Sequence, residues 1–190
     1  MTLSHGDFWK PFPAELQGTF DLVNIRLIII SMGPGIWEST LRNVLTLLKP
    51  GGAIQWTEGN FLEARGFRGV SEASTGGHAL TRGQRQFNAT LVKRFKWCYP
   101  EWTELFEGAG LQRVEEDVLS TDRLVEQRPE FTEIGIGAVY GALANLAKTG
   151  GEGYWGVEEV KEARERALED RKSGAYLRWD LNVTVGFTKE

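Results

Sequence analysis

The sequence is poor in the residues that build disulfides and metal centres. Its 190 residues include one cysteine, Cys98, and two histidines, His5 and His78, which excludes an internal disulfide and a histidine-based zinc site. Acidic residues outnumber basic ones by 26 to 22, giving a formal net charge of −4, so the chain lacks a basic footprint for nucleic acid. We therefore expect a protein of a reducing compartment with neither a metal nor a nucleic-acid partner.

Long apolar runs are also missing. The longest uninterrupted one, Leu27–Ile30, is far shorter than the roughly 20 residues of a membrane span. The first seven residues have neither the basic nor the apolar region of a signal peptide. With 41% hydrophobic and 25% charged residues, the composition is that of a folded globular protein. These features predict a cytoplasmic protein that does not contact a membrane.

The first half of the chain has the pattern of a strand, a helix and a second strand. Residues 20–30 are rich in β-branched side chains and end in four apolar residues, as expected for a strand covered on both faces. After a Gly/Pro loop, apolar residues recur at helical spacing from Trp37 to Leu48. Pro50-Gly51 then fits the middle of a type II turn, and 53–58 forms the next strand. This βαβ unit predicts an α/β fold with adjacent parallel strands.

The remainder of the chain is expected to complete one domain, 1–190. In the segment 64–100, glycines interrupt any regular spacing of apolar residues, and only Phe87 to Phe95 has the pattern of a short helix. This segment is therefore predicted to be an insertion over the site. Downstream, the patterns predict a helix at 102–109, a strand at 111–119, and helices at 131–148 and 157–172. The strict alternation of 179–187 predicts a strand with one buried face.

Several of these segments resemble, in this order, the second half of class I S-adenosylmethionine-dependent methyltransferases, in particular the fungal secondary-metabolism type. They are 20–26, the helix that ends in Lys49-Pro50-Gly51-Gly52, the strand 54–58, and Ala109-Gly110-Leu111. The resemblance implies that 20–30 is the family's fourth strand and that 179–187 is its antiparallel seventh. It implies an incomplete Rossmann-like methyltransferase fold, with a mostly parallel sheet, an antiparallel C-terminal strand and a helical insertion.

The family's Gly-rich cofactor-binding half has no counterpart in this sequence. No Gly-rich turn between a strand and a helix precedes Phe20, and no strand ends there in an acidic residue for the ribose. The resemblance carries over only the end of the third strand, at Asp7 and Phe8, where the family's acidic residue reaches the adenine amine. We therefore expect S-adenosylmethionine to be the family's cofactor but not to be bound by this truncated chain alone.

The apolar strand 20–30 is expected to have a free edge, because the strand beside it in the family is absent. An exposed, flat, apolar edge is a pairing site. The sequence therefore predicts a homodimer or a heteromeric partner that covers this edge, in addition to a small-molecule substrate.

The candidate site residues lie mainly at the predicted carboxyl ends of strands, where open α/β sheets bind ligands. Glu58 is a candidate base, with an ion pair to a nearby arginine as its structural alternative, and His78 is a candidate proton acceptor. Asn24 and Arg26, together with Asp7 and Phe8, are candidate cofactor contacts. The candidate substrate pocket consists of Trp56, Trp97 and Tyr140, and core packing is the alternative for these aromatic residues.

Three functions agree with these features. The first is a methyltransferase-like protein that acts on a small, largely apolar metabolite, with oxygen, nitrogen or carbon as the atom that accepts the methyl group. The second is a cofactor-independent cyclase or isomerase that uses the methyltransferase scaffold. The third is a non-catalytic regulatory or scaffold subunit that pairs with an intact methyltransferase. Fold alone does not decide among them.

Overall fold

The computed structural model describes residues 6–33, 35–60, 63–68, 78–95 and 99–190. The chain divides into two compact units. The first contains Met1–Gly59, Lys96–Val118 and Leu181–Glu190, and the second contains Asn60–Phe95 and Leu119–Asp180. The sequence had predicted one domain with 64–100 as an insertion over the site, and that prediction stays untested.

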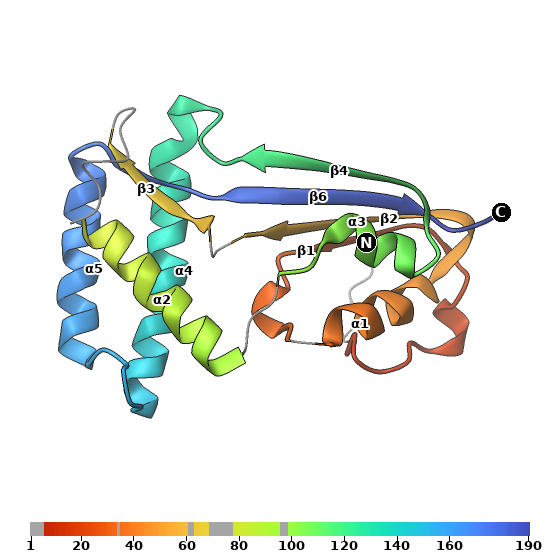
Figure 1. The fold of residues 1–190 in the computed structure, drawn as a ribbon, viewed down its shortest axis with the longest axis horizontal. Coiled ribbons are helices and arrows are strands. Elements are labelled where there is room, and N and C mark those ends of the chain that lie inside the picture. The colour runs from red at the N-terminus through yellow and green to blue at the C-terminus, as the bar shows by residue number, and fades with distance from the viewer. Residues whose placement is uncertain (1–5, 34, 61–62, 69–77, 96–98) are drawn as a thin grey trace. The chain divides into compact units, whose positions relative to one another are not determined.

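The first unit is built on a four-stranded mixed sheet (Figure 1). Its strand order is β1-β2-β6-β4; β1 and β2 are parallel, and β6 runs antiparallel to β2. The predicted α/β class, the parallel first pair and the antiparallel C-terminal strand are thereby confirmed. The strands are β1 (Phe20–Arg26), β2 (Leu48–Gly59), β4 (Gln112–Ser120) and β6 (Asp180–Phe187).

Helices α1 (Ile36–Leu45) and α3 (Trp102–Gly108) pack on one face of this sheet. Trp37 of α1, Trp56 of β2 and Trp102 of α3 meet there, with ring centroids 5.4 to 5.9 Å apart. All three are buried. The helical spacing that begins at Trp37 therefore reflects this core. Helix α3 agrees with its prediction, whereas α1 ends at Leu45 and Leu48, predicted to be helical, begins β2. Two single turns of 3-10 helix, η1 (Ala14–Leu16) and η2 (Ile29–Ser31), complete the first unit.

The Lys49-Pro50-Gly51-Gly52 segment lies at the start of β2, and its Gly51 has the positive φ that the predicted turn requires. Gly51 has a φ of +74°, the value that only glycine adopts readily at this position of a type II turn. The chain just after β6 holds the turn, because Gly51 N donates to Lys189 O at 3.0 Å and Thr188 N donates to Gly52 O at 2.9 Å. The start of β2 and the end of β6 are thus fixed together.

The first strand is shorter than predicted. It ends at Arg26, because Leu27 has a φ of +54° and Ile29–Ser31 form η2. The prediction of a strand through residue 30 was wrong for these last residues. Their apolar character reflects partial burial around a turn: Ile29 is 1% exposed, whereas Leu27 and Ile30 are about half exposed.

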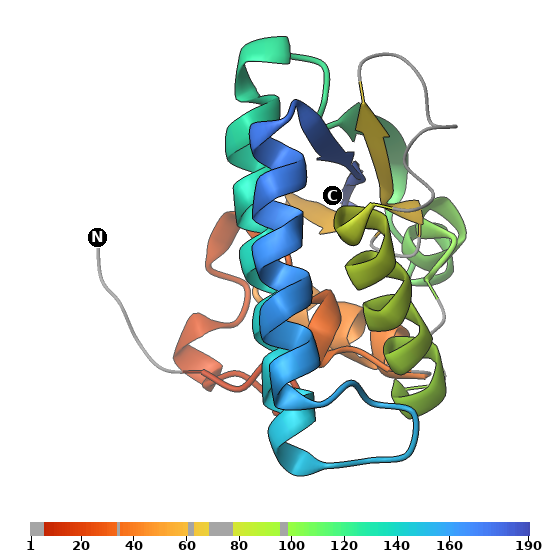
Figure 2. The same cartoon turned by 90° about the vertical axis from the view of Figure 1, so that its left-hand side faces the viewer.

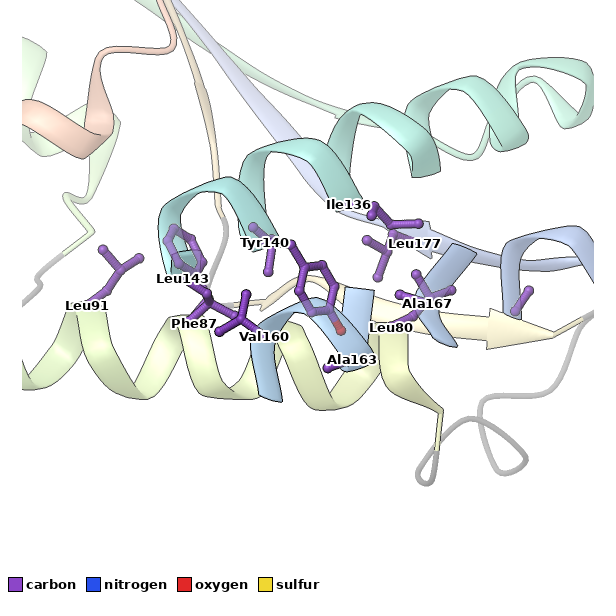
Figure 3. Close-up of a cluster of buried hydrophobic side chains, with 12 residues drawn as sticks. Leu80, Phe87, Leu91, Ile136, Tyr140, Leu143, Val160, Ala163, Ala167 and Leu177 are labelled. Atoms are coloured by element: carbon purple, nitrogen blue, oxygen red, sulfur yellow. The ribbon is translucent and has the colours of Figure 1, made fainter. Parts of the chain in front are cut away.

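In its described residues, the second unit has three α-helices and a two-stranded antiparallel sheet. Helices α4 and α5 lie side by side (Figures 1 and 2), and α2 packs on both. Figure 3 shows the apolar core between them, into which Tyr140 points from α4. The helices are α2 (Ala79–Phe95), α4 (Arg128–Thr149) and α5 (Val157–Lys172), preceded by η4 (Val125–Gln127), and the strands are β3 (Arg65–Arg68) and β5 (Ala175–Arg178).

Among the described residues, no helix is both long enough and apolar enough to pass through a bilayer.

Candidate functional site

Glu58 lies at the carboxyl end of β2 with no exposed surface. Its Oε1 accepts hydrogen bonds from Ile28 N at 2.8 Å and from Trp56 Nε1 at 3.0 Å, and its Oε2 accepts one from Ile29 N at 3.3 Å. The carboxylate therefore holds the turn that follows β1. The sequence had expected Glu58 to face a crevice, but the structure buries it among backbone and indole donors.

The pKa of the Glu58 carboxyl is raised above its ordinary value of 4.5. Burial is the main cause, because the charged form loses its hydration. The hydrogen bonds from Trp56, Ile28 and Ile29 favour the charged form and oppose the rise. A raised pKa suits a proton acceptor, but the described contacts of Glu58 assign it first to positioning the β1–α1 connection.

A second polar group lies beside Glu58, and the sequence analysis missed it. Tyr99 donates from its hydroxyl to Asn182 Oδ1 at 3.1 Å and to the Glu58 carbonyl oxygen at 3.4 Å. Asn182 in turn donates to Glu116 Oε1 at 2.6 Å, and Thr103 donates to Glu116 Oε2 at 3.1 Å. The only signal for Tyr99 in the sequence is its position just before Pro100 and the α3 helix.

Tyr99 also lines a surface groove of about 490 Å³ between α1 and α3. This volume lies in the range of small-molecule sites. The walls near Tyr99 include apolar atoms of Pro100 and Leu105, and the rim carries charged side chains from both helices. The lining residues are Glu38, Arg42, Tyr99, Pro100, Glu101, Glu104, Leu105, Gly108 and Ala109.

The four predicted cofactor contacts lie in the first unit. Asn24 and Arg26 are exposed on β1. Asp7 is bonded within its own turn, since Trp9 N donates to Oδ1 at 3.0 Å and Lys10 Nζ lies 3.1 Å from Oδ2. The backbone hydrogen bond from Trp9 is the main cause that lowers the pKa of Asp7. Phe8 is half-buried, and its carbonyl oxygen accepts from Asn43 of α1 at 2.7 Å.

The predicted substrate-pocket residues are not gathered in one described cavity. Trp56 is fully buried in the first unit, whereas Tyr140 is 2% exposed in the core of the second. Tyr140 donates from its hydroxyl to Ala79 O at 2.7 Å, and burial raises its pKa. Trp97 lies outside the described residues. His78 is half-buried just before α2, in the second unit, and is therefore not in the unit that holds Glu58.

The described residues near Asp7 do not fit an adenine contact as they stand. Both oxygens of the carboxylate already have partners within the Asp7–Lys10 turn, so an adenine amine would have to displace one of them. In the described part of the chain, no three His, Cys, Asp or Glu side chains are grouped to hold a metal ion.

The sequence is similar to curated fungal methyltransferases. Methyltransferase psoC of Aspergillus fumigatus is 28% identical over 143 residues, which cover 73% of this chain and 48% of psoC. N-methyltransferase gliN of the same fungus is 30% identical over 116 residues, or 57% of this chain and 38% of gliN. N-methyltransferase sirN of Leptosphaeria maculans is 44% identical over 52 residues, or 27% and 18%. The chain thus spans less than half the length of these relatives.

Solved structures give weaker likenesses. The [4+2]-cyclase SpnF is 18% identical with a TM-score of 0.44, and the match covers 98% of this chain and 55% of SpnF. Phosphoethanolamine N-methyltransferase 2 of Haemonchus contortus, in complex with S-adenosyl-L-methionine, is 15% identical with a TM-score of 0.42, covering 92% and 34%. Both TM-scores lie below 0.5, so neither likeness decides between functions.

No protein-family model matches the sequence. The curated relatives are nevertheless all methyltransferases. The parallel strands, the Pro-Gly turn and the antiparallel last strand that carried the resemblance are present in the structure. In sequence and in these structural features, the chain resembles class I S-adenosylmethionine-dependent methyltransferases.

Proposed function

We propose that the chain is a methyltransferase-like protein of fungal secondary metabolism that acts on a small, largely apolar metabolite. The similarity to psoC, gliN and sirN supports the reaction class. Two of these relatives are named N-methyltransferases, which favours nitrogen as the acceptor atom. The observation that carries the proposal within the structure is the groove beside Tyr99.

The groove fits an apolar molecule with a basic nitrogen. Pro100, Leu105 and the Tyr99 ring supply apolar surface, and three glutamates against one arginine make the rim acidic. A protonated amine gains charge-assisted hydrogen bonds from such carboxylates. Tyr99 is held in the groove wall by the hydrogen bond from its hydroxyl to Asn182 Oδ1.

An apolar amine is expected to bind this groove through its glutamates. With tryptamine as the fluorescent probe, the double variant Glu101→Gln/Glu104→Gln should lower the affinity about tenfold, since one lost charge-assisted bond is worth about 1.5 kcal/mol. Glu107→Gln is the matched control, because Glu107 is exposed on the same helix but does not line the groove. Equal effects in both variants, or no binding to the wild type, would contradict this assignment.

The isolated chain is expected not to bind S-adenosylmethionine at micromolar concentration. Micromolar affinity corresponds to about 8 kcal/mol, and each unpaired, desolvated ligand group costs about 1–3 kcal/mol. The carboxylate of Asp7, the acidic residue carried over for the adenine amine, is already hydrogen-bonded. Isothermal calorimetry of the purified chain with S-adenosylmethionine tests this, and a micromolar dissociation constant would show that the chain binds the cofactor on its own.

The same purified chain distinguishes the alternative functions. Methylated product from labelled S-adenosylmethionine and an apolar amine would establish an autonomous methyltransferase. Conversion of an apolar substrate without added cofactor would favour the cyclase or isomerase. Amine binding without any conversion would favour a non-catalytic subunit.

A further inference from the structure

The two short strands of the second unit place two arginines side by side. Arg65 of β3 and Arg178 of β5 are directly opposed in the antiparallel register. Two residues away on each strand, Phe67 and Tyr176 are opposed in the same way. Because side chains alternate between the two faces of a strand, these four share one face of the strand pair. Directly opposed like charges are destabilising, so the two guanidinium groups favour an anion on this face.

Asp180 fixes the orientation of Arg178 without using all of its donors. Arg178 donates from Nε to Asp180 Oδ1 and from Nη2 to Oδ2, both at 3.2 Å, and its Nε lies 3.8 Å from Asp122 Oδ1. Burial alone would raise the pKa of Asp180, but the hydrogen bond from Arg178, with smaller contributions that include the charge of Arg65, lowers it. A guanidinium has five N–H donors, and no described residue accepts from Nη1 of Arg178. The outer edge of Arg178 is thus oriented and open to a second carboxylate.

A small pocket of about 190 Å³ lies at this arginine pair. Phe67 and Trp179 provide its apolar part, and the Phe67 ring is held by stacking on Tyr176, with centroids 5.6 Å apart and planes inclined by 19°. The volume is below the range of sites for drug-sized ligands, so the occupant must be small. The lining residues, all of the second unit, are Glu63, Arg65, Phe67, Arg178, Trp179 and Asp180.

The lining carries charges of both signs. Asp180 is engaged by Arg178, whereas the side chain of Glu63 is exposed and has no hydrogen bond or ion pair to a described residue. A ligand with only a negative charge would be repelled by Glu63, and a ligand with only a positive charge would be repelled by the two arginines. The pocket therefore favours a ligand that carries both charges.

We propose that this pocket binds a small zwitterionic α-amino acid with a flat apolar side chain. Its carboxylate accepts charge-assisted hydrogen bonds from Arg65 and Arg178, for which the planar guanidinium is well suited. Its ammonium group pairs with Glu63, and its side chain packs on Phe67 and Trp179. The proposal does not depend on the proposed function, because the groove beside Tyr99 lies in the first unit.

Isothermal calorimetry of the full chain with L-phenylalanine tests the pocket. The wild type is expected to bind, and Arg65→Gln should weaken the affinity about tenfold because charge-assisted hydrogen bonds to the carboxylate are lost. Arg65 is exposed, so this variant is expected to fold. Arg164→Gln is the matched control with unchanged affinity, since Arg164 is exposed on α5 of the same unit and does not line the pocket.

A second ligand, 3-phenylpropanoate, lacks the amine and gives Glu63 a signature that a merely structural role would not produce. Glu63→Gln should weaken the binding of L-phenylalanine about tenfold, because an attraction to the ammonium group is lost. The same variant should strengthen the binding of 3-phenylpropanoate, because a repulsion is removed. The proposal would be overturned by a wild type that does not bind L-phenylalanine at millimolar concentration, or by equal affinities of Arg65→Gln and Arg164→Gln. A Glu63→Gln variant that does not change the two affinities in opposite directions would also overturn it.

Discussion

Replacing Glu58 with alanine is expected to lower the free energy of unfolding of the first unit by about 3 to 5 kcal/mol, because three hydrogen-bond donors lose their acceptor at about 1–3 kcal/mol each. The variant leaves Ile28 N, Ile29 N and Trp56 Nε1 without their acceptor. Water cannot replace the carboxylate without opening the core around Trp56, which has no exposed surface. Urea denaturation followed by tryptophan fluorescence, with amide exchange at Ile28 and Ile29, measures the loss.

Two further variants check that assignment. Glu58→Gln keeps one acceptor oxygen but turns an NH2 group toward an N–H donor, so we expect a smaller loss of about 1–3 kcal/mol. Glu115→Ala, at an exposed position on β4 of the same unit, should change stability by less than about 0.5 kcal/mol. A Glu58→Ala protein as stable as the wild type would contradict this structural role and would instead favour a role in chemistry.

The raised pKa of Glu58 predicts the sign of a pH dependence. Because its folded pKa lies above the unfolded value near 4.5, its contribution is fully present below that value and is lost as pH rises through the raised folded pKa. The stability difference between wild type and Glu58→Gln should therefore shift against the wild type with rising pH. Measuring both proteins at each pH cancels the other titrating groups, and a constant difference would contradict the raised pKa.

Replacing Gly83 with alanine is expected to destabilise the second unit by up to about 3 kcal/mol. A Cβ atom at Gly83 of α2 would lie 2.5 Å from Cζ of Tyr140, and its nearest neighbour would be the Tyr140 hydroxyl oxygen. Tyr140 is fixed by its bond to Ala79 O and by the surrounding core, so the ring cannot withdraw without overpacking its neighbours. Thermal and urea unfolding followed by circular dichroism measure the effect.

Gly141→Ala on α4 is the matched control. A Cβ there would meet no atom within 4 Å, so the variant should stabilise the helix by about 0.5–1 kcal/mol through alanine's higher helix propensity. If Gly83→Ala is equally harmless, the core can accommodate a Cβ atom between α2 and Tyr140, and the prediction is wrong.

Local patterns predicted most of the secondary structure. The helix at 157–172 has its predicted bounds, and the predicted turn at Pro50-Gly51 has the required positive φ. Contacts distant in sequence explain the differences. The strand 20–30 stops at Arg26 because Glu58, far along the chain, takes the N–H groups of Ile28 and Ile29. The short strands β3 and β5 were not predicted, because helices α2, α4 and α5 lie between them in the sequence.

The candidate site was harder to predict for a related reason. A carboxylate at a strand end looks the same in sequence whether it faces a ligand or backbone donors, and only the geometry shows that Glu58 binds Ile28, Ile29 and Trp56. Aromatic residues are equally ambiguous, and both Trp56 and Tyr140 prove to be core residues. The role of Tyr99 depends on Asn182 and Glu116, which no local motif connects to it.

The position of β6 between β2 and β4 has a consequence for how the chain folds during synthesis. On the ribosome, β1, α1 and β2 emerge before α2, and β2 gains its second neighbour only after α2, α4 and α5 have been made. Until then an edge of β2 is bare. Long-range pairing of this kind slows folding and exposes unpaired strands to aggregation. The sheet of the first unit therefore cannot be completed until Leu181–Glu190, which follow every residue of the second unit, have been made.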